Sequence, residues 1–166
     1  RELIDEIGET SYNPYYFELH NNSMNKLIFE TFKIFEIDFV IKLDGLAGGK
    51  GVFVQGDHFK TREEGIKLIK SKLEENKIII EKKITGEEFS LFTLSDGEHF
   101  FHLPPVQDYK RAYENNEGPN TGGMGSIMDE FHFLNKNDII KSEKLNEKVL
   151  RYIKKKYNKP YIGILY

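Results

Sequence analysis

Hydrophobic and polar positions along the chain follow two different periods, one typical of strands and the other of helices. Short apolar runs bounded by turn residues predict strands over residues 15–19, 39–43, 52–54, 78–81 and 161–166. Apolar positions at helical spacing predict a helix that Asn22 or Ser23 caps, a second that begins after Thr61, and a third over residues 138–157. Strands and helices therefore alternate along the chain.

The turn chemistry adds three expectations. Residues 95–98 read Ser-Asp-Gly-Glu, which predicts a hairpin between strands 88–94 and 99–103 because Asp-Gly tolerates positive φ. Thr61 and Glu64 have the spacing of a capping box. Residues 104–125 follow neither period and predict a long loop, of a length that is usually functional or disordered. The helical periods predict that these residues point inward: Ile66, Ile69, Leu73, Ile140, Leu145, Val149 and Ile153.

Composition excludes several classes of protein. The 166 residues are 39% hydrophobic and include 13 Phe and 9 Tyr, which suffices for a packed core. A formal net charge of −3 gives no basic field for nucleic acid, and the lack of cysteine excludes disulfides and thiolate metal sites. No apolar run approaches the roughly 20 residues that span a bilayer, and no secretory signal opens the chain. The expectation is a cytoplasmic protein that binds no membrane.

Both ends of the sequence look cut. The chain starts at Arg1, inside what reads as a helix closed by Gly8, and it stops at Tyr166 inside a predicted strand. We therefore expect an internal piece of a longer protein, with some ligands beyond either end.

The most informative local feature is the glycine-rich segment 40–52, VIKLDGLAGGKGV. It fits neither a P-loop nor a Rossmann fingerprint, and it predicts a strand, a glycine loop and a second strand. Such a loop brings backbone N–H groups close to an anion, with Lys50 at its tip. Lys42 lies inside an apolar strand, where an unpaired ammonium is costly and a buried phosphate would offset the cost. A plain hairpin with two solvated lysines fits the spacing equally well.

Two further segments carry candidate chemistry. Residues 78–89 turn abruptly from apolar to polar, and such a hinge can present backbone groups to an adenine edge while Glu88 takes ribose hydroxyls; an ordinary amphipathic hairpin is the alternative. In the predicted loop, Lys110 and Arg111 are natural phosphate ligands, and residues 118–125 offer small donors and close backbone approach. A mobile surface loop has a similar composition.

Four blocks, VIKLDGLAGGKGVFV, IIIEKKITGEEFSLFTLSDGE, LPPVQDYKRAYENNEGPNTGGMG and YIGILY, together resemble the glycinamide ribonucleotide synthetases (phosphoribosylamine–glycine ligases) of the ATP-grasp superfamily. The resemblance implies an α+β ATP-grasp fold. Residues 1–36 would be a linker and the start of the ATP-grasp region, 37–95 the lid subdomain, and 96–166 part of the larger subdomain, truncated at its C-terminus.

The same resemblance implies roles for individual residues. ATP would be bound by Lys42, Gly48, Gly49, Lys50, Gly51, Glu81, Lys83, Ile84 and Glu88. Phosphoribosylamine would be bound by Asp108, Asn120, Thr121, Gly122 and Gly123, with Lys110 and Arg111 as the catalytic cations. The hinge departs from the family's usual Glu-Glu-Phe-Leu, because it reads Glu81-Lys82-Lys83-Ile84.

By this likeness the parent protein ligates glycine to 5-phosphoribosylamine through a glycyl phosphate, with ATP and Mg²⁺, in purine biosynthesis. The metal ligands would lie beyond Tyr166, with none in this chain, so the fragment itself would be inactive. The alternatives are another ATP-grasp carboxylate–amine ligase and a nucleotide-binding module that never catalyses. We also predict from the sequence that Lys42→Ala weakens ATP binding and leaves the fold intact.

Overall fold

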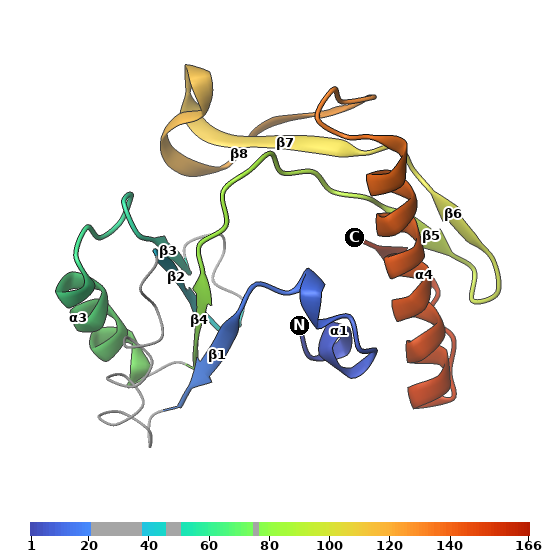
Figure 1. The fold of residues 1–166 in the computed structure, drawn as a ribbon, viewed down its shortest axis with the longest axis horizontal. Helices are drawn as coiled ribbons and strands as arrows, with labels where there is room; N and C mark the ends of the chain where they lie inside the picture. The colour runs from blue at the N-terminus through green and yellow to red at the C-terminus, as the bar shows by residue number, and fades with distance from the viewer. Residues whose placement is uncertain (21–37, 46–50, 75–76) are drawn as a thin grey trace. The chain divides into compact units, whose positions relative to one another are not determined.

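A computed structural model describes residues 1–20, 38–45, 51–74 and 77–166. Contacts within the chain define two compact units, and Figure 1 labels their elements: one unit is Asn13–Thr85, and the other combines Arg1–Tyr12 with Gly86–Tyr166. The subdomain boundaries predicted at residues 36 and 95 of this chain stay predictions.

The unit Asn13–Thr85 contains a four-stranded antiparallel sheet in the order β1-β4-β2-β3. Its strands are β1 (Tyr16–Leu19), β2 (Phe39–Leu43), β3 (Val52–Val54) and β4 (Ile78–Lys82). All four predicted strands of this region are confirmed. The helix predicted to begin at Asn22 or Ser23 lies outside the described residues.

The strand register gives the sheet one apolar face and one mixed face. Val40 pairs with Glu81 and Ile41 with Ile80, so alternate residues of neighbouring strands share a face. The helix α3 (Arg62–Leu73) covers the apolar face (Figure 1). Eight buried side chains form the core there: Leu19, Phe39, Ile41, Phe59, Ile69, Leu73, Ile78 and Ile80.

A capping box starts α3, as the sequence predicts. The Thr61 hydroxyl accepts the Glu64 N–H at 3.2 Å, and the Glu64 carboxylate accepts the Thr61 N–H at 3.3 Å. The same carboxylate accepts the Lys60 N–H at 2.7 Å. The backbone N–H groups of Lys60 and Thr61 therefore lower the pKa of Glu64.

The second unit contains a three-stranded sheet and a long helix. The sheet has the order β6-β5-β9, with strands β5 (Thr93–Ser95), β6 (Phe100–His102) and β9 (Gly163–Leu165). The helix α4 (Lys136–Tyr157) confirms the predicted helix, and Asn135 caps it. The unit also contains α1 (Glu2–Glu6) and the short helical turns η1 (Thr10–Tyr12) and η3 (Glu114–Asn116).

A buried polar network joins α4 to the sheet. Asn146 donates through Nδ2 to the Thr93 hydroxyl at 2.9 Å and to the Leu91 carbonyl at 3.1 Å, and Thr93 is fully buried. One inward prediction for α4 is wrong, because Ile140 is 43% exposed. The helical period shows which residues share a face, but it cannot show how far along the helix the neighbouring layer extends.

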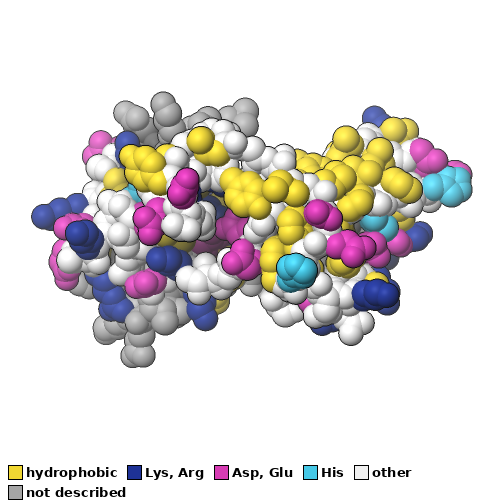
Figure 2. All heavy atoms as spheres, turned by 90° about the horizontal axis from the view of Figure 1, so that it is seen from above, with side chains coloured by type: hydrophobic (Ala, Val, Ile, Leu, Met, Phe, Trp, Pro, Cys, Tyr) yellow, Lys and Arg dark blue, Asp and Glu magenta, His cyan; other side chains and the backbone are white. Residues whose placement is uncertain are grey.

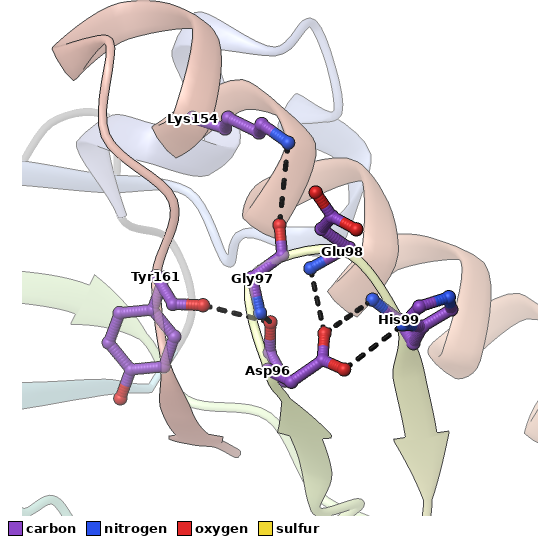
Figure 3. Close-up of polar contacts among 7 residues, drawn as sticks. Asp96, Gly97, Glu98, His99, Lys154 and Tyr161 are labelled. Carbon is purple, nitrogen blue, oxygen red and sulfur yellow. Dashed lines mark hydrogen bonds and ion pairs between the residues drawn. The ribbon is translucent and has the colours of Figure 1, made fainter.

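The Asp-Gly turn between β5 and β6 confirms the predicted hairpin (Figure 3). Gly97 has a φ of +98°, which is why glycine is suited to this position. The Asp96 carboxylate accepts the N–H groups of Glu98 and His99 at 2.8 and 2.7 Å, and it contacts the His99 imidazole at 3.0 Å. From α4, Lys154 reaches the Gly97 carbonyl at 3.5 Å.

The loop predicted over residues 104–125 is wrong. These residues form an antiparallel hairpin of β7 (Val106–Tyr113) and β8 (Glu117–Met128). Two register irregularities, at which β8 has more residues between successive pairs than β7, break the regular alternation of side chains, which explains why the sequence shows no strand period. The hairpin exposes apolar side chains of both strands, such as Tyr113 and Met124, and hydrophobic side chains gather on the surface seen in Figure 2.

Candidate functional site

Lys42 lies on the mixed face of the sheet, opposite the face that α3 covers. Because Val40 pairs with Glu81 on the neighbouring strand, Lys42 and Glu81 occupy diagonal positions on this face. The Lys42 ammonium forms an ion pair with the Glu81 carboxylate. The Glu81 side chain is only 7% exposed, and that of Lys42 is 33% exposed.

This pair changes the interpretation of Lys42. From the sequence, a bound phosphate is one partner that would offset the cost of an ammonium in an apolar strand, whereas in the structure the carboxylate of Glu81 already supplies a partner. The same contact gives the Glu81 side chain a role that the hinge interpretation, which used only its backbone, did not include.

The glycine-rich loop is only partly described. Gly51 is buried, and its carbonyl accepts the Leu43 N–H at 2.8 Å, which closes the end of the β2–β3 hairpin. Gly48, Gly49 and Lys50 lie outside the described residues. Their predicted contacts with phosphate stay predictions.

The hinge residues lie at the end of β4. The Lys83 N–H donates to the Asp38 carbonyl at 2.9 Å, and the Lys83 ammonium donates to the Gln55 carbonyl at 2.8 Å. Ile84 is 67% exposed. Sequence reasoning missed Gln55, since it lies 28 positions from Lys83 and no local pattern connects the two.

In the second unit, the structure brings three predicted site residues together. The Lys110 ammonium lies 3.2 Å from the Asp108 carboxylate and 3.5 Å from that of Glu88. Burial by itself would lower the pKa of Lys110, but the hydrogen bond and charge of Asp108, assisted by Glu88, outweigh it and raise the pKa. Lys110 is therefore a charged ammonium that lies between two carboxylates.

Arg111 holds the tip of the β7–β8 hairpin. Its Nη1 donates to the Gly118 carbonyl at 2.8 Å, and it lies opposite Asn120 in the strand register. The Thr121 hydroxyl donates to the Lys110 carbonyl at 2.9 Å and accepts the Gly123 N–H at 3.0 Å. Thr121 thus joins the two strands beside Lys110.

The remaining predicted substrate residues, Asn120, Gly122 and Gly123, are exposed along β8. Sequence reasoning missed two neighbours of this cluster. Gln107 donates to the Glu87 carboxylate at 3.2 Å and accepts the Tyr109 hydroxyl at 3.1 Å. Gln107 and Tyr109 alternate with Asp108 and Lys110 along β7, which places their side chains on the other face of this strand.

Three other features of the described residues concern metal binding, membrane spans and a cavity. In this part of the chain no three Asp, Glu or His side chains form a group that could hold a metal. None of the described helices is long and apolar enough to cross a membrane. A cavity of about 370 Å³ lined by residues of α4 and the end of α1, including Lys148 and Tyr152, contains no predicted site residue.

Comparison with known proteins identifies the family. Residues 9–166 match the family model described as phosphoribosylglycinamide synthetase, ATP-grasp (A) domain. The chain is 42% identical over 132 residues to a phosphoribosylamine–glycine ligase of Methanocella arvoryzae, and 43% identical over 136 residues to one of Methanococcus maripaludis. Each match covers 78% of this chain and 30% of the relative, so the chain spans about a third of the length of these relatives.

Solved structures give the same assignment of fold. A phosphoribosylamine–glycine ligase from Thermotoga maritima matches 98% of this chain and 40% of its own, with a TM-score of 0.78 and 30% identity. A D-alanine–D-alanine ligase from Bacillus anthracis, solved in complex with ATP, matches 89% of this chain and 44% of its own with a TM-score of 0.58; at 20% identity it supports the fold alone. The α+β ATP-grasp fold expected from the sequence is confirmed, and the chain belongs to the phosphoribosylglycinamide synthetase ATP-grasp domain family.

Proposed function

We propose that the full-length protein ligates glycine to 5-phosphoribosylamine at the expense of ATP, and gives glycinamide ribonucleotide, ADP and phosphate as a step of purine biosynthesis in the cytoplasm. The family match over residues 9–166 carries this proposal. It is supported by relatives named as phosphoribosylamine–glycine ligases. The ATP-grasp domain of the matched family supports the choice of nucleotide.

In this proposal the unit Asn13–Thr85 contributes to the nucleotide site. Lys42, Lys50 and the backbone of Gly48, Gly49 and Gly51 contact phosphates, and the backbone of Glu81, Lys83 and Ile84 contacts adenine. Support comes from the position of Lys42 on the mixed face of the sheet, where its side chain is a third exposed and its ammonium contacts Glu81. A cation in this position can add a phosphate oxygen to its existing carboxylate partner.

The second unit contributes ribose and substrate contacts. Glu88 binds the ribose hydroxyls of the nucleotide, while Asp108, Asn120, Thr121, Gly122 and Gly123 shape the pocket for phosphoribosylamine. Lys110 and Arg111 provide positive charge near the transferred phosphoryl group. The cluster of Lys110 with Asp108 and Glu88 supports these roles, because it places an ammonium beside two carboxylates that can accept from hydroxyl or amine donors.

The chemistry then consists of two displacements. A glycine carboxylate oxygen attacks the γ-phosphorus of ATP, which gives a glycyl phosphate and ADP. The amine of phosphoribosylamine attacks the acyl carbon, the amide forms, inorganic phosphate leaves, and the amine loses a proton. The chain's residues bind, orient and neutralise charge in both steps. Mg²⁺, when bound, neutralises phosphate charge, and its ligands are expected outside this chain.

The proposal is tested by ADP release from the full-length protein. Release should require both glycine and phosphoribosylamine, and Lys110→Met should reduce it. Release with a different acid or amine would favour another ATP-grasp carboxylate–amine ligase, and nucleotide binding without any turnover would favour a non-catalytic module. Either result would refute the proposed reaction. We expect the isolated chain to show no turnover.

A further inference from the structure

The short edge strand β3 ends at a cross-connection that involves Gln55. The Gln55 N–H donates to the Phe39 carbonyl at 3.2 Å, and the Gln55 side-chain oxygen accepts the Phe39 N–H at 3.3 Å. These bonds close the base of the β2–β3 hairpin. The main-chain carbonyl of Gln55 takes no part in them, and it accepts the Lys83 ammonium at 2.8 Å.

Lys83 contacts both sides of this hairpin base. Its backbone N–H donates to the carbonyl of Asp38, the residue before β2, and its side chain donates to Gln55, the residue after β3. Since β2 lies between β4 and β3 in the sheet, the side chain spans the end of β2. A single residue at the end of β4 therefore connects that strand to both strands of the hairpin.

The connection matters because β3 is an edge strand of only three residues, and β2 is its one neighbour in the described sheet. Phe53 also packs on the core, and Val54 bonds to Asp57 and His58 in the turn that follows, so Lys83 provides the link from this turn back to β4. The Lys83 contact is a partly buried, charge-assisted hydrogen bond, and such bonds are stronger than those between neutral groups. Its loss should allow β3 to separate from β2 more often.

Gly51, which precedes β3, would move with that strand. Its carbonyl accepts the Leu43 N–H, so separation of the whole of β3 from β2 would also break this bond, at the end of β3 near Lys42. The ladder between β2 and β4 contains five residue pairs and does not depend on β3. The hinge backbone at the end of β4 should therefore keep its position when the connection is lost.

We propose that the Lys83 side chain is a positioning residue that keeps β3 and Gly51 in register with the hinge, and that it thereby supports binding of the phosphates but not of the adenosine portion of the nucleotide. This inference rests on the proposed function, in which the hinge backbone contacts adenine and Gly51 contacts phosphate. It adds a side-chain role to a residue whose backbone alone was expected to act.

The experiment compares ATP and adenosine binding to the full-length protein by calorimetry. Lys83→Met keeps the length of the side chain and removes the donor. The expected result is ATP affinity about tenfold lower with adenosine affinity changed less than about twofold, as for the loss of one charge-assisted hydrogen bond. Lys70→Met is the matched control, since Lys70 is exposed on α3 in the same unit, and both affinities should stay unchanged.

A measurement without nucleotide separates the two proposals. Hydrogen exchange should be about tenfold faster at the Leu43 and Gln55 amides of Lys83→Met, in line with a local opening that costs one hydrogen bond less. Equal losses for ATP and adenosine, or an unchanged ATP affinity, would overturn the positioning role. If the wild-type protein bound neither ligand, the proposed function and the nucleotide role of Lys83 would both fail, and unchanged exchange would refute the connection itself.

Discussion

Replacement of Lys42 by methionine removes an ammonium from a buried ion pair while keeping most of the side-chain volume. The partner carboxylate, Glu81, is 7% exposed, so water cannot take the place of the lost cation. The Lys42 side chain is a third exposed, and solvent already screens part of the interaction. The substitution should therefore destabilise the sheet as well as weaken nucleotide binding.

The magnitude follows from these two exposures. Breaking a fully buried pair by removing one partner costs about 3–5 kcal/mol, and screening at the exposed side of Lys42 lowers this to about 2–3 kcal/mol. For a chain of this size, each kcal/mol corresponds to roughly 2–4 °C, so the midpoint of thermal unfolding should fall by about 5–10 °C. The sequence-based expectation that Lys42→Ala leaves the fold intact stays a prediction, and we now expect the fold to persist at lower stability.

A double-mutant cycle measures the pair. Urea unfolding of the full-length protein would be followed for Lys42→Met, Glu81→Gln and the combination, with hydrogen exchange of the Ile41 and Ile80 amides to locate the effect in the sheet. The double variant should be more stable than the sum of the single losses predicts, by about 1–3 kcal/mol. An unfolding free energy of Lys42→Met within about 0.5 kcal/mol of wild type is the range of an ordinary surface substitution. Such a value, together with additive effects of Lys42→Met and Glu81→Gln, would refute the stabilising role of the pair.

Three further predictions concern other parts of the chain. Gly65→Ala should lower the unfolding free energy by about 1–2 kcal/mol despite the higher helix propensity of alanine, since its Cβ would lie 2.8 Å from a core phenylalanine ring; an unchanged urea midpoint would contradict this. The Asp96 hydrogen bond raises the pKa of His99 above its ordinary 6.5, so the stability gained from the pair is full below pH 6.5 and is lost as the pH rises through the raised pKa. His99→Ala should therefore lower the midpoint of thermal unfolding more at pH 5.5 than at pH 8.5. Equal losses at the two pH values would argue against the pair. Arg111→Ala, which removes the bond to Gly118, should raise the KM for phosphoribosylamine about tenfold and that for ATP less, and equal increases would count against a substrate role.

Local signals in the sequence predicted local structure well. The capping box of Thr61 and Glu64, the Asp96-Gly97 turn and the strands on either side of Lys42 are all present, because each depends on residues close together in the chain. The family was also recognisable from the sequence, since the motifs that identify it are contiguous.

The partners of the candidate site residues could not be predicted in the same way. Lys42 meets Glu81 across a strand pair, Lys83 meets Gln55 from 28 positions away, and Lys110 meets Glu88 from another segment. Sequence spacing shows which residues share a face of one element, but register and long-range approach decide which charges meet. The irregular β7–β8 hairpin was missed for a related reason, because its bulges hide the period of two.

Lys42 and Lys110, two of the cations proposed to lie near phosphate, differ in what nucleotide binding would require of them. The partner of Lys42 is a carboxylate whose side chain is only 7% exposed, and separating an ion pair at such a burial is costly, so the Lys42–Glu81 pair should persist when phosphate binds. The partners of Lys110 are 41% and 81% exposed, so they can be released to water at little cost. Binding of ATP should therefore rearrange the contacts of Lys110 and leave those of Lys42 in place. A nucleotide-bound structure in which Glu81 no longer contacts the Lys42 ammonium would show that burial does not decide which contacts are kept.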